Sequence, residues 1–334
     1  MRLSFDEMYT QIKRVLMKYG MNEQKASICA RVHTESNNDG IFSHGTNRVE
    51  RFVDYMQKGW VHPNADPTVE KDLGSIMVLN GNLGPGITNA LTAVDYGMAM
   101  ARKNGVGMVG LHNTTHWMRG GTYGLYAANK GFVAILWTNT ESCMPPWGGK
   151  TCKMGNNPFI MAMPGDPNPI MLDMAMSQYA YGKLEVTRQA GKRLPFPGGF
   201  SVDGRLTDIP GEIEESRRIL PMGYWKGSSF AFMLDILGAV LSNGIAAADI
   251  DKTGKGSCGG ASQIFIIIDP SQITDYDRMI ALTRQEIAHI KSADLAENAT
   301  GIMAPGEDYV MYRAEHAKNG IFVDDAVWQT ICAL

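Results

Sequence analysis

The sequence lacks the features that define several large classes of protein. Its five cysteines are odd in number, widely spaced and never form C-x-x-C, so they indicate neither a disulfide framework nor a zinc site. No apolar run has the length of a membrane span, and the N-terminus reaches Asp6 and Glu7 before an apolar signal region could form. These absences predict a cytoplasmic protein that has no membrane partner.

Charge of one sign is also scarce. The chain has 31 Lys and Arg residues against 34 Asp and Glu residues, which gives a net charge of −3, and no block of like charge is long. Nucleic acid is therefore not an expected partner. A length of 334 residues allows a substantial core in one domain or two.

A dinucleotide-binding fingerprint is missing from the context in which it works. The stretch from Gly105 to Gly110 reads literally as G-x-G-x-x-G, but a helix is predicted before it and a strand after it. A Rossmann pyrophosphate site requires the reverse order. Gly105 is better explained as a helix C-cap, and Gly107 and Gly110 as strand residues that allow close packing. A standard Rossmann domain is not expected.

What is present indicates an α/β protein with helices at both ends of the chain. Ser4 and Glu7 form a capping box for a first helix, and Asp324 can cap the last one. Strands are predicted at 76–79, 106–111, 132–137, 158–163, 170–174 and 262–269, with helices between them at 87–103, 122–129, 181–190 and from 227 onward. We therefore expect a mixed α/β lobe, residues 76–274, and a helical lobe built from residues 1–75 and 275–334.

Two segments carry more specific structural predictions. The helix that opens at Gly227 and Ser228 has apolar residues on nearly every side, which favours burial all round. Residues 194–211 are too rich in Pro and Gly for regular structure, so a long loop with a function is expected there.

The first concentration of chemistry runs from Ile41 to Arg48. His44 has the side chain whose ordinary pKa lies closest to neutrality, and Arg48, four residues later, offers the planar fork that binds a carboxylate. Together they suggest an acid/base group beside an anion site. In the alternative interpretation, Ser43 caps the next helix and the other two are solvated polar residues.

A second concentration follows the strand that ends near Leu111. It pairs His116 with Arg119, and polar loops at strand ends commonly carry function. His112 and His116 lie four residues apart, but no H-E-x-x-H motif and no third ligand cluster accompany them, so no metal is expected. Alternatively, His116 and Trp117 simply fill a gap between a helix and the sheet.

Two further stretches are rich in polar groups. The loops around Thr140 and Asn157 offer hydroxyl and amide donors that suit a sugar-like chain or a ribose, although surface turns use the same residues. Lys226 lies near the start of a helix, where the ammonium and the helix dipole would act together on a phosphate or a carboxylate.

These stretches together resemble the type-2 malate/L-lactate dehydrogenase family, and most closely its 2,3-diketo-L-gulonate reductase branch. The resemblance extends from the first helix to Val323-Asp324-Asp325. The motifs that carry it are Ser43-His44-Gly45 with Arg48, Asn113 to Gly121, Pro145-Pro146-Trp147-Gly148, Gly155 to Pro158, and Leu220 to Ser228.

The resemblance implies a non-Rossmann mixed α/β fold, a homodimer with its site near the subunit interface, and NAD(P)H as hydride donor. We expect NAD as the cofactor, with NADH preferred and NADPH as the alternative. The histidine that matches His44 is the proton donor in the diketogulonate reductases, whereas other relatives give the acid/base role to the one that matches His116. Glu307 stands where relatives often have histidine. The implied cofactor residues are Pro169, Ile170, Met171, Leu172, Asp173, Met174, Ala175, Trp225, Lys226, Gly306, Glu307 and Asp308.

The resulting hypothesis is reduction of a sugar-derived 2-oxo acid, 2,3-diketo-L-gulonate, to 3-dehydro-L-gulonate. Hydride reaches the C2 carbonyl while His44 donates the proton. Ser43, Arg48, Arg119, Thr140 and Asn157 are the predicted substrate-binding residues. Two alternatives remain, a malate or L-lactate type dehydrogenase of the same family and a non-catalytic sugar-acid binding protein.

Overall fold

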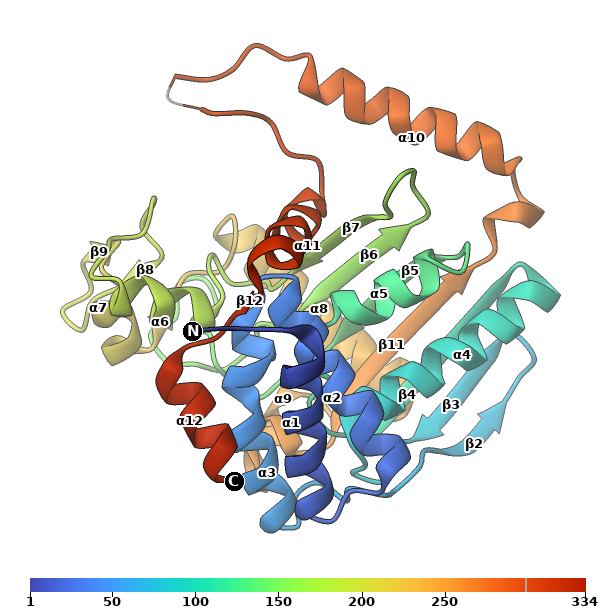
Figure 1. Cartoon of the computed structure of the whole chain (residues 1–334), viewed down its shortest axis with the longest axis horizontal. Helices are drawn as coiled ribbons and strands as arrows, with labels where there is room; N and C mark the ends of the chain where they lie inside the picture. Colours follow the sequence, from blue (N-terminus) through green and yellow to red (C-terminus); the bar gives the residue numbers. More distant parts are fainter. Residues whose placement is uncertain (298) are drawn as a thin grey trace.

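A seven-stranded mixed sheet runs through the middle of the protein (Figure 1). The computed structural model describes residues 1–297 and 299–334, and within them the strand order is β2-β3-β4-β11-β5-β6-β7. β3 and β4 are parallel and the other neighbours are antiparallel, which confirms a non-Rossmann sheet. The strands are β2 (Thr68–Asp72), β3 (Ile76–Asn80), β4 (Val106–Thr114), β5 (Val133–Thr138), β6 (Phe159–Met163), β7 (Ile170–Met174) and β11 (Ala261–Ile268).

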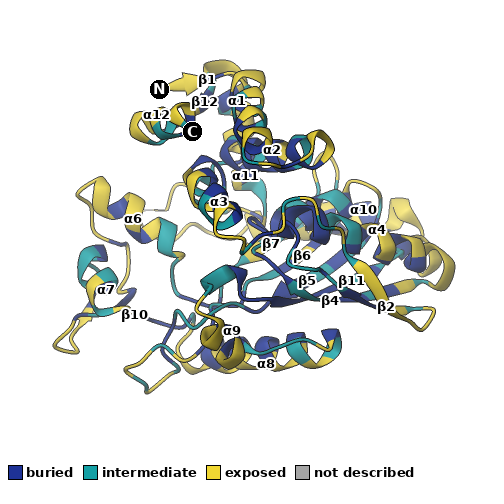
Figure 2. Cartoon of the chain, turned by 90° about the horizontal axis from the view of Figure 1, so that it is seen from below, coloured by how far each residue is buried: buried dark blue, intermediate teal, exposed yellow. Residues whose placement is uncertain are grey.

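Helices cover both faces of this sheet (Figure 2). Side chains alternate along β11, so Phe265 and Ile267 enter the core beneath α4 and α5, whereas Ile264 enters the core beneath α8. Burial on both sides explains why this strand is almost continuously apolar. The helices are α4 (Gly86–Asn104), α5 (Gly121–Ala128) and α8 (Trp225–Ser242).

The glycines of β4 have the packing role that the sequence predicts. A Cβ on Gly107 would lie 2.3 Å from the carbonyl oxygen of Gly97 in α4, and one on Gly110 would lie 2.5 Å from that of Leu241 in α8. Gly105 ends α4 with a positive φ of 81°. The stretch that resembles a nucleotide fingerprint is therefore a site of close helix–strand packing.

The two ends of the chain form a helical layer above the sheet in Figure 2. The capping box of Ser4 and Glu7 starts the first helix, and Asp324 caps the last. β1 and β12 pair antiparallel, which joins the two ends. The elements are β1 (Arg2–Leu3), α1 (Phe5–Lys18), α2 (Glu23–Asn38), α3 (Val49–Gln57), α11 (Glu307–Asn319), β12 (Ile321–Phe322) and α12 (Asp325–Ala333).

Two boundaries differ from the sequence predictions. β2 falls within the range predicted for the helical lobe, yet it pairs with β3 in the sheet. All its residues are exposed, so its sequence carries no alternating apolar pattern. The predicted loop 194–211 contains short strands and the start of a helix. The sequence could not predict these strands, because elements of two residues are too short to show a period. The loop belongs to a small region of residues 181–219, which comprises α6 (Tyr181–Gln189), β8 (Gly199–Phe200), β9 (Leu206–Thr207), α7 (Pro210–Ser216) and β10 (Arg218–Ile219).

The expectation that α8 is buried all round is wrong. Its outer side exposes apolar side chains at helical spacing, among them Phe232, Met233 and Val240. A helix that is apolar on every side gives no sequence signal for which side meets the sheet. In the described part of the chain, no single helix has the length and composition to cross a membrane; α8 meets those criteria only jointly with α9 (Ala247–Thr253), at a bend of 77°. The remaining long helix is α10 (Tyr276–Lys291).

Candidate active site

A cavity of about 750 Å³ lies between the helical layer and the sheet. Its lining combines the turn before α3, the loop after β4, and the ends of β5, β7 and β11. The fold thus brings together stretches that are far apart in the sequence. The predicted site residues that line the cavity are Ser43, His44, Arg48, His116, Arg119, Thr140, Asp173 and Ala175.

Two 3-10 turns, η1 (Phe42–His44) and η2 (Thr46–Arg48), hold the first predicted stretch. Between them, Gly45 lies so close to α2 that a Cβ would meet the amide oxygen of Asn37 at 1.8 Å. The same oxygen accepts a hydrogen bond of 2.7 Å from the backbone N–H of Thr46. The turn is therefore fixed against α2, which gives the side chains that follow it a defined direction.

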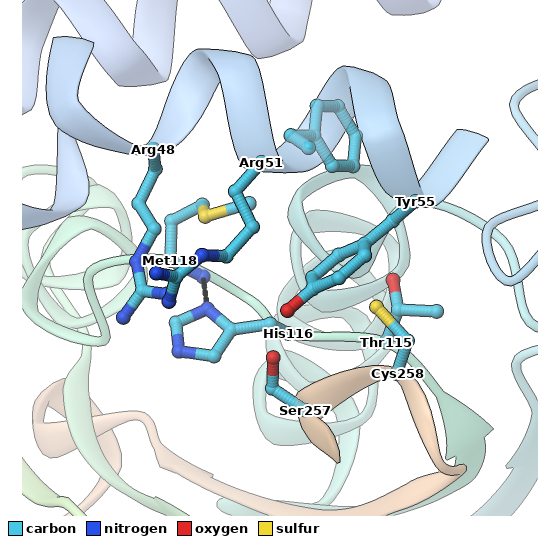
Figure 3. Close-up of a pocket in the computed structure, with 9 residues that line it drawn as sticks. Arg48, Arg51, Tyr55, Thr115, His116, Met118, Ser257 and Cys258 are labelled. Atoms are coloured by element: carbon cyan, nitrogen blue, oxygen red, sulfur yellow. Dashed lines mark hydrogen bonds between the residues drawn. The ribbon is translucent and has the colours of Figure 1, made fainter. Parts of the chain in front are cut away.

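The two candidate histidines lie face to face. The ring centroids of His44 and His116 are 5.7 Å apart, with 23° between the ring planes. Ser43 does not cap a helix, and its Oγ lies 3.0 Å from Nδ1 of His44. Nδ1 of His116 accepts a 2.9 Å hydrogen bond from the backbone N–H of Met118 (Figure 3). A neutral His116 therefore carries its proton on Nε2, on the other side of the ring.

Burial and positive charge keep both imidazoles neutral. Burial, followed by the charges of Arg48 and Arg119, lowers the pKa of His44 to about 3. Burial and then Arg48 hold the pKa of His116 well below its usual value. Burial also lowers the pKa of Arg48, with neighbouring Arg51 adding to the effect. The site therefore carries excess positive charge and would stabilise an anion.

Arg48 and Arg51 point from the start of α3 toward His116 (Figure 3). Both line the cavity, so their guanidinium groups are placed to bind a carboxylate through parallel hydrogen bonds. Sequence reasoning missed Arg51, although its spacing of three residues from Arg48 puts it on the same side of a helix.

Arg119, the second predicted carboxylate ligand, is already paired within the protein. Its guanidinium contacts Asp39, which Arg313 also contacts at 3.1 Å through Nη2. Arg119 is 4% exposed and Asp39 is 1% exposed, so this is a buried ion pair. Arg119 thus ties the loop that carries His116 to the end of α2 and to α11, and its charge acts on the site from a fixed position.

Asn157 does not reach the cavity. Its side-chain oxygen accepts the backbone N–H of Thr140 at 3.0 Å, and its Nδ2 donates to the carbonyl oxygen of Ala231 at 2.7 Å. The side chain is fully buried and its polar atoms are used within the protein. It therefore holds the loop of Thr140 against α8, while its neighbour Asn156 lines the cavity. The structure thus places Asn156 at the cavity, and not the predicted Asn157.

The three cofactor segments implied by the resemblance follow one continuous track. At one end, the backbone N–H of Met171 donates to the carbonyl oxygen of Pro305 at 3.3 Å, beside Gly306. At the other end, the carbonyl oxygen of Met176 accepts the N–H of Met222 at 2.7 Å, just before α8. Residues 169–176 thus connect the start of α11 to the start of α8.

This track fits a dinucleotide in its chemistry. Lys226 lies exposed in the first turn of α8, where its ammonium and the helix N-terminus would act together on a phosphate. Gly306 has a φ of 90°, and a Cβ there would lie 3.1 Å from the nitrogen of Met171, so the backbone forms a close cradle. Glu307 pairs with Lys291 and accepts a hydrogen bond from the N–H of Ala304. Its carboxylate is therefore engaged by neighbouring residues of the protein.

Two more lining residues escaped the sequence prediction. Gln263 lies at a buried position of the apolar strand β11 and lines the cavity. A polar residue in such a strand could have indicated a functional position from the sequence. Glu141 lies in an irregular loop whose direction no sequence pattern fixes. Burial raises the pKa of its carboxyl group, and Arg48 opposes that shift.

His33, which lies beneath the turn, makes stability depend on pH. It is fully buried, its Nδ1 lies 3.1 Å from the carbonyl oxygen of Gly45, and burial lowers its pKa to about 4. Because the unfolded chain takes up this proton below about pH 6.5, stability falls as the pH drops from there toward 4. His33 alone is expected to remove about 2 kcal/mol of unfolding free energy between pH 7 and pH 5.

Urea unfolding of wild type and His33→Gln at both pH values measures this effect. His44 and His116 act in the same direction in both proteins, so the variant is expected to lose less on acidification. Equal losses in the two proteins would contradict the assignment to His33.

Paired imidazoles beside uncommitted guanidinium groups define an acid/base site for an anionic substrate. The family profile for malate/L-lactate dehydrogenase matches residues 3–332, and the chain belongs to that family. It is accordingly an oxidoreductase that acts on a hydroxy or oxo acid, in a family that generally uses a nicotinamide cofactor. The chain is 40% identical to the 2,3-diketo-L-gulonate reductase of Escherichia coli K12, over 100% of both chains.

Solved structures resemble this fold over nearly its whole length. A malate dehydrogenase from Pyrococcus horikoshii OT3 has a TM-score of 0.90 and 27% identity, covering 99% of this chain and 93% of that one. The sulfolactate dehydrogenase from Methanocaldococcus jannaschii has a TM-score of 0.89 and 27% identity, with 99% and 95% coverage. One scaffold thus serves oxidoreductases named for different acids.

Proposed function

We propose that this protein reduces 2,3-diketo-L-gulonate to 3-dehydro-L-gulonate with NADH. The observation that carries the proposal is that imidazole and guanidinium groups line the same cavity as hydroxyl and amide groups. The imidazoles and the guanidinium groups suit the carboxylate and the reacting carbonyl of a 2-oxo acid. Hydroxyl and amide side chains, including Thr140 and Asn156, suit a hydroxylated chain. The relative that is 40% identical is named for this reaction.

The proton transfer falls to His44. When bound, the reduced nicotinamide supplies the hydride that adds to the C2 carbonyl carbon. His44 donates a proton to the carbonyl oxygen, and the Ser43 hydroxyl can accept from a charged imidazole as well as donate to a neutral one. Protonation of His116 on Nδ1 would break its hydrogen bond from Met118. His116 therefore stays neutral and donates through Nε2–H to the same oxygen.

Substrate binding sets the protonation state of His44. Burial is the largest cause of the low pKa of His44, and the charges of Arg48 and Arg119 add to it. A carboxylate held by Arg48 would offset the contribution of the charges, so we expect proton uptake to accompany binding. In the direction of oxidation, neutral His44 accepts the proton of the hydroxyl group. Asp39 anchors Arg119, which leaves Arg48 as the main carboxylate ligand, although Nε of Arg119 has no hydrogen-bond partner among the described residues.

The test is an assay of cofactor oxidation with 2,3-diketo-L-gulonate, oxaloacetate, pyruvate and a cyclic imine, each with NADH and with NADPH. We expect the highest kcat/KM for 2,3-diketo-L-gulonate with NADH. A strong preference for oxaloacetate or pyruvate would indicate a malate or L-lactate dehydrogenase instead, and no turnover with any substrate would indicate a binding protein.

We also propose that the protein is a homodimer and that the outer side of α8 lies in its interface. Phe232, Met233, Ile236 and Val240 expose 58%, 49%, 39% and 69% of their surface along one helical stripe. The same helix begins with the cofactor segment at Trp225, which would place the site near the partner.

Sedimentation of the Val240→Asp variant tests this interface. A buried, unpaired carboxylate on each copy is expected to shift the wild-type dimer to monomers. Leu73→Asp is the matched control, because Leu73 is 69% exposed and lies between β2 and β3 at the edge of the sheet, whereas α8 packs on β4, β5 and β11. A monomeric wild-type protein, or a dimeric Val240→Asp variant, would refute the proposal.

A further inference from the structure

Gln263 is a buried amide with both polar atoms unused. Its side chain is 0% exposed and lines the cavity. Neither its Nε2 nor its Oε1 has a hydrogen-bond partner among the residues that the structure describes. A buried polar group without a partner is costly, so such a side chain at a cavity wall indicates a group that completes its bonds with a ligand.

The register of the sheet places this amide on the substrate side of the cavity. Gln263 pairs with Leu111 of β4 and Thr138 of β5. It shares a sheet face with Phe265, which packs against Trp117, the residue after His116. Asp173 on the cofactor track belongs to β7, three strands from β11, which corresponds to roughly 14 Å.

The polar neighbours of Gln263 are already engaged within the protein. The hydroxyl of Thr138 donates to the carbonyl oxygen of Asn139 at 2.9 Å. The side chain of Asn139 donates to Asp235 and accepts the N–H of Ser262. Asn156 accepts the hydroxyl of Thr140 at 3.3 Å. Gln263 is therefore the member of this wall whose donor and acceptor are both available to a ligand.

We propose that Gln263 binds a hydroxyl group of the substrate chain and so selects hydroxylated 2-oxo acids over short ones. A hydroxyl both donates and accepts, which matches the two ends of a carboxamide. The imidazoles and Arg48 hold the reacting end of the substrate, and Gln263 binds the hydroxylated chain beyond that end. The inference rests on the proposed reductase function and adds its specificity residue.

The test compares the wild type with Gln263→Leu, which leaves an apolar branched side chain one bond shorter and removes both polar atoms. The measured quantity is the ratio of kcat/KM for 2,3-diketo-L-gulonate to kcat/KM for pyruvate. We expect the ratio to fall roughly 10- to 100-fold, because a site built to bind a hydroxyl loses its discrimination without the polar partner. Ser262→Ala is the matched control on the opposite face of the strand, and it should leave the ratio unchanged.

Titration of NADH by fluorescence separates a substrate role from a cofactor role. The dissociation constant of NADH should be the same in Gln263→Leu and wild type. If it rises while the substrate ratio stays constant, the amide binds the cofactor carboxamide and the proposal is wrong. An unchanged ratio with unchanged NADH binding would also overturn it.

A binding measurement keeps the inference testable if no 2-oxo acid is turned over. L-gulonate should raise the melting temperature of the wild type more than that of Gln263→Leu, whereas L-lactate should affect both equally. That result, with no turnover, would refute the reductase proposal and retain Gln263 as a hydroxyl-binding residue. Equal effects of L-gulonate on both proteins would refute the role of Gln263.

Discussion

Replacement of His44 by Asn is expected to lower kcat for the reduction of 2,3-diketo-L-gulonate by a factor of roughly 100 to 10,000. The Asn amide can still contact the carbonyl oxygen, but it cannot release a proton to the alkoxide that forms there. KM should change little, because Arg48 still holds the carboxylate. Initial rates at saturating substrate and NADH measure the effect.

His116→Asn is the matched control, since the same substitution is made on a ring whose centroid is 5.7 Å away. The Asn side chain retains an N–H donor, so its loss in kcat should stay within about 10-fold, the scale of one hydrogen bond. An inactive His116→Asn enzyme together with a nearly normal His44→Asn enzyme would exchange the two roles.

The Asp39→Asn variant is expected to lose about 3 to 5 kcal/mol of unfolding free energy. Removal of this charge takes from the guanidinium of Arg119, which is 4% exposed, its hydrogen-bonded counter-ion and leaves only the carboxylate of Asp173, 3.7 Å from Nε. Arg313 loses the same partner, which loosens α11 from the end of α2. Urea denaturation at neutral pH measures the change.

The matched control is Asp54→Asn. Asp54 pairs with Lys58 on α3, but the two side chains are 46% and 49% exposed. Exposed pairs contribute about 0 to 1 kcal/mol, so little change is expected. Similar losses in both variants would show that the buried pair of Asp39 and Arg119 contributes no more to the free energy of unfolding than an exposed pair.

Local patterns in the sequence predicted much of this fold. The capping box at Ser4 and Glu7 depends on residues three positions apart, and the glycines of β4 fit a strand packed closely between helices. His44, Arg48 and His116 were found because each stands in a dense polar stretch beside a predicted element, and all three line one cavity.

What the sequence could not reveal depends on contacts between distant residues. Asp39 and Arg119 are 80 residues apart. No local sequence pattern therefore shows that Arg119, a predicted carboxylate ligand, pairs with a carboxylate of the protein itself. Asn157 and Asn156 are adjacent amides, and only the backbone direction decides which one faces the cavity. The outer side of α8 is apolar like its inner side, so its exposure could not be read from composition.

The place of β11 has a consequence for how this protein is made. β11 fills the gap between β4 and β5, yet β5 ends at Thr138 and β11 begins only at Ala261. While the ribosome synthesises the intervening residues, the facing edges of β4 and β5 have no strand between them. Unpaired apolar edges are templates for wrong pairing and aggregation. A nascent chain stopped before Ala261 is therefore two open half-sheets rather than a smaller enzyme.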